Sequence, residues 1–313
     1  MGQAMGDSLL AYWRDRHGYQ SFLYAIGALF AISAAVHSIA FFIYGGPWEG
    51  PVSWRKPIAF SASFAVILPS LAWVMGFLPA RRRAAWILSA ALGTASVFEV
   101  SLIALQQWRG VPSHFNDATD LDSGIFAAMG SFVGIIAVSI VVLTLWTLRP
   151  LDAPPSVALA IRTGMVLLLA GQALGGAIIA NGVPQVGDRP IGSLNIFGEA
   201  GVMKVPHSVA LHALQVLIVL AWLALFTRWD ESRRTRVVGA ACAGYSGLLL
   251  VSTFQTFSGL APFDLAPFMG VLVMASTALA IGPFCVTAAA LVEAMRAAPT
   301  ARPGAPDSLG NLP

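Results

Sequence analysis

Residues 123–147 read SGIFAAMGSFVGIIAVSIVVLTLWT, a run of 25 residues without one charged side chain. The hydrocarbon core of a bilayer is about 30 Å thick, and an α-helix needs about 20 apolar residues to cross it. Backbone polar groups have no water to bind within lipid, so a single segment can satisfy them only as a helix. This run therefore predicts a transmembrane helix.

Seven more segments have the same character: 21–44, 57–79, 85–108, 158–182, 207–227, 236–258 and 265–295. The whole chain has 57% hydrophobic and 11% charged residues, against about 25% charged in an ordinary soluble protein. Such a chain cannot cover itself with polar surface in water. We therefore predict an all-α integral membrane protein with about eight transmembrane helices in a lipid bilayer.

The arginines and lysines predict the orientation of these spans. With the N-terminus inside, twelve basic residues fall on the inner side and five on the outer side, an excess that the orientation rule for membrane proteins favours. Because arginines at helix ends account for the net charge of +3, that charge indicates no nucleic-acid partner. We expect a multi-pass protein of a bacterial inner membrane with both termini in the cytoplasm.

An internal similarity suggests that the chain is duplicated. KPIAFSASFAVILPSLAWVMGF, starting at Lys56, resembles VPHSVALHALQVLIVLAWLALF, starting at Val205, and the alignment places Ser63 on His212. Two units in the same orientation would be a parallel repeat about an axis along the membrane normal. The predicted divisions are a cytoplasmic segment (1–20), two four-helix bundles (21–150 and 158–295), and a disordered cytoplasmic tail (296–313).

Three ionisable residues inside the spans indicate where a functional site lies. His37, Glu99 and His212 come from three different helices, and an ionisable group within a span is costly enough to be a functional candidate. At 1.5 Å per residue, both histidines lie roughly 8–10 Å below the outer boundary, and Glu99 about 13 Å. We expect the three to converge in the outer leaflet, and Glu99 to have one of the histidines as its partner.

Other polar and basic residues fall at or above the same level. Ser63, Gln106 and Gln215 are expected beside the three ionisable groups, with the loop of His114 above them. Three cations, Arg55, Lys56 and Lys204, precede or begin two of the helices. Because cations at helix N-termini favour anions, we expect an anionic ligand at the outer face. Trp48, Trp54 and Trp108 are expected to be interfacial anchors.

Four classes of function are compatible with these residues. In a redox protein, His37 and His212 would be the axial ligands of haem b, and the cofactor would also contact Arg55, Lys56, Gln215 and Ser63. The second class is a transporter of a small solute or ion. In the third, a membrane hydrolase, Glu99 would be catalytic and a single transition-metal ion would be held by His37, His212, Glu99 and His114. The fourth is a structural membrane subunit.

Several sequence motifs that are typical of enzymes are absent. It contains no Walker A loop, GxGxxG, HExxH or GxSxG motif. The two cysteines lie in apolar stretches and form no CxxC pair, so they indicate neither a disulfide framework nor a thiolate metal site. Substrate and oligomeric state are not predicted.

Overall fold

The computed structural model describes residues 6, 10, 13–79 and 81–296. Apart from Arg296, the tail predicted to be disordered lies outside these residues. Within them, eight helices are long and apolar enough to cross a membrane, which confirms the predicted class of all-α multi-pass membrane protein. They are α2 (Gly18–Tyr44), α3 (Arg55–Met75), α4 (Arg82–Trp108), α5 (Asp120–Thr147), α6 (Pro155–Gly182), α7 (Lys204–Ala224), α8 (Glu231–Phe257) and α9 (Pro267–Arg296).

Most helices begin a few residues before the predicted span, and at α5 and α8 a polar cap accounts for the extension. Thr119 is the N-cap of helix α5, and its side chain accepts a hydrogen bond from the Asp122 main chain at 3.1 Å. Helix α8 begins at Glu231 because the side chain of Asp230 accepts from the Arg233 main chain at 2.7 Å. Hydropathy alone does not register such a polar first turn.

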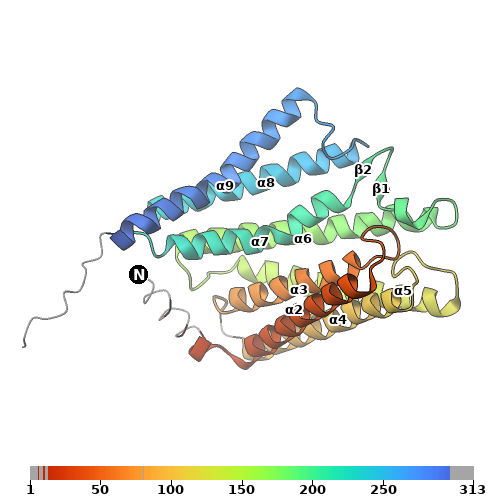
Figure 1. The fold of residues 1–313 in the computed structure, drawn as a ribbon. Helices are drawn as coiled ribbons and strands as arrows, with labels where there is room; N and C mark the ends of the chain where they lie inside the picture. Colours follow the sequence, from red (N-terminus) through yellow and green to blue (C-terminus); the bar gives the residue numbers. More distant parts are fainter. Residues whose placement is uncertain (1–5, 7–9, 11–12, 80, 297–313) are drawn as a thin grey trace, which may run out of the picture.

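The eight helices run along one common direction, and the start of α2 and the end of α9 lie at the same end of the bundle (Figure 1). At the opposite end are the long connections, one of which contains the short 3₁₀ helices η1 (Val183–Gln185) and η2 (Ile191–Ser193). The same connection contains a hairpin of β1 (Ile196–Phe197) and β2 (Gly201–Val202). We call this the loop end of the molecule and the other the terminal end.

The helices pair in the same way in both halves of the chain. Helix α2 packs on α3 and α4 packs on α5, while α6 packs on α7 and α8 packs on α9. The two halves meet where α5 contacts α6 and where α3 contacts α7. This pairing is what a duplicated chain would produce, and the parallel repeat remains a prediction until the halves are superposed.

Close approach of α6 and α7 depends on Gly164. A Cβ at this position would lie 2.7 Å from the Cα of Leu214, a residue that is completely buried. Gly176 lies on the same helix, but a Cβ there would meet nothing within 4 Å. The two glycines therefore offer a matched pair of positions for one substitution.

We expect Gly164→Ala to destabilise the protein by about 1–3 kcal/mol, the usual penalty for forcing an extra carbon into a packed core. Gly176→Ala should leave stability unchanged or raise it slightly, since alanine favours the helix. Thermal unfolding in detergent measures both. Equal melting temperatures for the two variants would contradict the close contact of α6 with α7.

Candidate functional site

The imidazole of His37 is buried at the loop end of α2, with both ring nitrogens in use. Its Nε2 accepts a hydrogen bond from the indole Nε1–H of Trp108 at 3.3 Å. Its Nδ1 therefore carries the proton and donates to the main-chain oxygen of Ser33 at 2.8 Å. The rings of Trp54 and Trp108 each have their centroids 6.3 Å from that of His37. In this arrangement His37 has no free nitrogen for a haem iron.

The hydroxyls of Ser33 and Ser61 extend this network from α2 to α3. Their oxygens lie 2.9 Å apart, and the Ser33 hydroxyl is also 3.3 Å from Nδ1 of His37. Ser61 is completely buried. We call α2–α5 the first helix group and α6–α9 the second. The network therefore joins α2, α3 and α4 through polar contacts at the loop end of the first helix group.

His212 takes part in a different contact, between the two helix groups. Its Nε2 lies 3.4 Å from the hydroxyl of Ser63, which joins α7 to α3. Ser63 and His212 are the two positions that the internal similarity aligns with each other. Two residues that a two-fold axis relates to each other come into contact when both lie near that axis. The predicted repeat would therefore place the Ser63–His212 contact near its two-fold axis.

Glu99 is buried in α4 without a partner. Its residue is 1% exposed, and neither carboxyl oxygen has a hydrogen-bond partner. The expected pairing with a histidine is wrong, because His37 is held by Trp108 and His212 contacts Ser63. An isolated carboxylate is costly in an apolar interior, so burial of this kind favours the protonated acid.

Two polar residues expected beside the histidines have other partners. Gln106 donates to the carboxylate of Asp122 at 2.9 Å, and Asp122 also forms an ion pair with Arg109 at 2.7 Å. Gln215, with its amide nitrogen turned toward the helix, donates to the main-chain oxygens of Leu211 and His212. The contacts of Gln106 join α4 to α5, and the hydrogen bonds of Gln215 stay within α7. Neither side-chain amide therefore joins His37 to His212.

The predicted cations gather at the loop end. Lys56 lies within electrostatic reach of both Arg55 and Lys204, so the first turns of α3 and α7 bring their positive charges together. All three side chains are half-buried. Lys56 donates to the main-chain oxygen of Pro51 at 2.7 Å. Among the described residues, none of the three forms an ion pair, although the negative charge of Glu49 acts on Lys204.

Unsatisfied polar atoms lie in the same part of the chain. Ser53, two residues before α3, is completely buried, and its hydroxyl has no hydrogen-bond partner. The Nε of Arg55 is also buried without a partner. We call Ser53, Arg55, Lys56 and Lys204 the basic cluster. Its free donors and its excess of positive charge suit an anion.

His114 lies in the connection between α4 and α5 and faces the same cations. Burial and the positive charges of Lys56 and Lys204 lower the pKa of this imidazole from 6.5 to about 3. Its ring lies against Phe60, with the centroids 5.9 Å apart, and its Nδ1 is 2.9 Å from the hydroxyl of Ser113. His114 is therefore neutral at physiological pH and adds no charge to the basic cluster.

The lowered pKa of His114 predicts how stability depends on pH. Between pH 6.5 and about 3 the unfolded chain binds a proton that the folded protein does not, so stability falls as the pH falls. The contribution is at most about 1.4 kcal/mol per pH unit. Substituting His114→Gln should flatten the melting temperature measured from pH 7 to pH 4. An unchanged pH profile would contradict the burial of a neutral imidazole.

The predicted metal ligands do not come together. Within the described ranges, no group of three or more His, Cys, Asp or Glu residues is placed to hold a metal ion. His37, His114, Glu99 and His212 therefore do not form such a group here. Direct coordination needs ligand atoms about 2.0–2.2 Å from one ion, and these side chains instead lie in separate networks.

Comparison of the chain with protein-family models, with curated proteins and with solved structures finds no match. The function therefore has to be inferred from the geometry of the residues themselves.

Proposed function

We propose that the protein is a membrane carrier that binds a small anionic solute at the loop end through the basic cluster. The observation on which this depends is the convergence of Arg55, Lys56 and Lys204 without an ion pair. Half-buried cations that form no ion pair with the described residues repel one another, and a bound anion relieves that repulsion. The first turns of α3 and α7 add the positive ends of two helix dipoles.

The position of the basic cluster favours transport over simple binding. Arg55 and Lys56 belong to the first helix group and Lys204 to the second, so one anion would contact both groups. Deeper along the same two helices, Ser63 and His212 form a polar contact between the groups. Carriers commonly bind substrate between two repeats and expose it by moving one repeat against the other.

The redox interpretation has less geometric support than transport. Both nitrogens of His37 are hydrogen-bonded, so haem ligation would require breaking the contacts with Trp108 and Ser33. A Soret band in the purified protein that disappears in both His37→Ala and His212→Ala would reverse this order of preference.

We propose that the loop end faces the outside of the cell and that both termini are cytoplasmic. The arginine-rich segments, including Arg81, Arg82 and Arg83, lie at the terminal end. In a background lacking Cys242 and Cys285, an impermeant thiol reagent should label Ser193→Cys but not Ser232→Cys in intact cells. The reverse pattern would place the basic cluster in the cytoplasm.

The test of the proposed function is anion binding and uptake by the purified protein. Isothermal titration would compare inorganic phosphate, a dicarboxylate, a monocarboxylate and a neutral analogue of the same size. We expect saturable binding of at least one anion, none of the neutral analogue, and weaker binding as the salt concentration rises. Proteoliposomes should then exchange the same anion. If no anion binds saturably, the carrier proposal fails.

A further inference from the structure

Helices α8 and α9 touch closely near their middles and diverge toward the loop end (Figure 1). A Cβ on Gly244 would meet the main chain of α9, including the carbonyl carbon of Leu279 at 2.6 Å and the nitrogen of Ala280. A Cβ on Gly247 would instead meet the side chain of Ser276. The missing side chains let the two backbones touch there. Pro283 interrupts the hydrogen bonds of α9 just beyond this contact.

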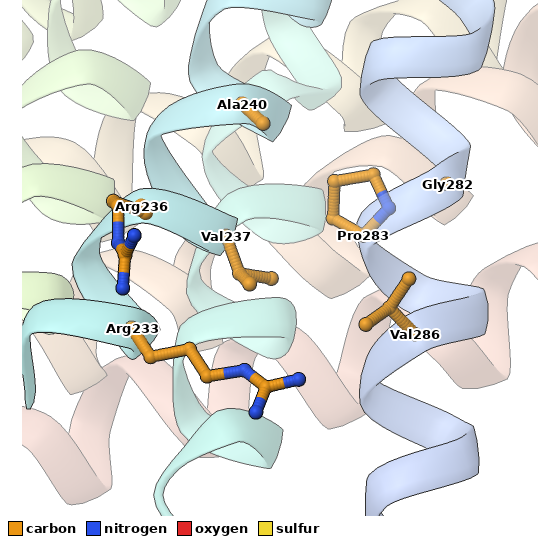
Figure 2. A pocket seen from close by; sticks show the side chains of 7 residues that line it. All are labelled: Arg233, Arg236, Val237, Ala240, Gly282, Pro283 and Val286. Atoms are coloured by element: carbon orange, nitrogen blue, oxygen red, sulfur yellow. The ribbon is translucent and has the colours of Figure 1, made fainter. Parts of the chain in front are cut away.

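On the terminal side of this contact, an open groove of about 570 Å³ lies between the two helices. Figure 2 shows the side chain of Arg233 extending from α8 toward α9 at one end of the groove. The remaining walls are largely apolar. The lining residues are Arg233, Arg236, Val237, Ala240, Gly282, Pro283 and Val286.

The two arginines of the groove carry uncompensated charge. Arg234, which lies between them in sequence, pairs with Glu231 at 3.5 Å, whereas neither Arg233 nor Arg236 has an ion pair among the described residues. Both are exposed. The guanidinium of Arg233 lies 4.8 Å from the ring centroid of Trp229, a residue type that concentrates at the membrane interface.

We propose that this groove binds one anionic phospholipid from the leaflet at the terminal end. The phosphate would bind Arg233, whose side chain extends toward α9, and Arg236 on the other flank of α8 would add positive charge. An acyl chain would run along Val237, Ala240 and Val286. Charged groups at the headgroup level above apolar walls match the two parts of a lipid, and basic pockets between transmembrane helices recognise anionic headgroups. This proposal is independent of the anion site at the loop end.

Retention of lipid through purification tests the proposal. Protein incubated with equal amounts of phosphatidylglycerol and phosphatidylcholine of identical chains would be examined by native mass spectrometry. The wild type should retain phosphatidylglycerol preferentially. The double variant Arg233→Gln, Arg236→Gln should retain roughly thirtyfold less, the loss expected when two arginines leave a membrane surface. Equal retention of the two lipids by the wild type would overturn the proposal.

Two further variants separate the groove from general surface charge. The double variant Arg82→Gln, Arg83→Gln removes the same charge at the same end of the bundle and should retain the lipid. Ala240→Phe keeps both groove arginines but fills the apolar wall, and should lose it. The groove is not the lipid site if Ala240→Phe retains the lipid or if the double variant Arg82→Gln, Arg83→Gln loses it. Displacement of the lipid by inorganic phosphate would also overturn the proposal. Circular dichroism of each variant shows whether a loss of lipid reflects a loss of folding. The double variant Arg233→Lys, Arg236→Lys keeps both charges and should retain the lipid.

Discussion

Removing two charges of the basic cluster, by Arg55→Gln with Lys204→Gln, should weaken anion binding by about a hundredfold or more. Each hydrogen bond to a charged group contributes roughly 1.5–3 kcal/mol, and two such losses correspond to at least that factor. The two residues come from different helix groups, so each single variant should also lose affinity. Isothermal titration with the anion that binds wild-type protein measures all three dissociation constants.

The control for this prediction is Arg189→Gln. Arg189 also lies in a connection at the loop end, but its guanidinium donates to the side chain of Gln185. A general electrostatic effect would weaken binding equally in Arg189→Gln and Lys204→Gln. A specific site predicts a large loss only for Lys204→Gln. The slope of affinity against salt should also become shallower in the double variant, because fewer fixed charges attract the anion.

The spans could be predicted from the sequence because lipid imposes a simple rule on composition. The run 123–147 has no charged side chain, and the structure extends it only to Asp120, where Thr119 caps the helix. The depth of a residue along its helix could also be predicted from the sequence, because the rise per residue of an α-helix is fixed. Ser63 and His212 were expected at one level, and they are in contact.

Lateral contacts could not be predicted in the same way. Trp108 was expected to be an interfacial anchor, yet its indole donates to His37, and no periodicity in the sequence indicates that pairing. Gln106 was expected beside the three ionisable groups, but the first turn of α5 gives it Asp122 as its partner instead. The position of a residue around the helix axis determines the direction in which its side chain points. The partner of that side chain depends instead on how neighbouring helices and loops pack.

The sequence and the structure together predict the protonation state of the buried Glu99 carboxyl. A carboxyl in a span must be paired, hydrated or protonated, and the structure leaves both oxygens without a partner. Glu99→Gln copies the protonated acid, so we expect its stability to stay within about 1 kcal/mol of wild type. Infrared spectra of the two proteins should differ by one carboxylic-acid band, which is present only in the wild type. A carboxylate band in the wild type would show instead that Glu99 is ionised.

The consequence for function is larger than the consequence for stability. If the carrier takes up its anion together with a proton, Glu99 is the buried group on α4 able to hold that proton, and Glu99→Gln should abolish the dependence of uptake on an imposed pH gradient. Anion binding at the basic cluster should persist, because the carboxyl oxygens of Glu99 form no hydrogen bond with any described residue of the cluster. Ser96→Ala is the matched control: Ser96 lies one turn away on the same buried face, and its hydroxyl bonds only to Leu92 of its own helix. Uptake that follows the pH gradient equally in wild type and Glu99→Gln would leave Glu99 without a role in proton coupling.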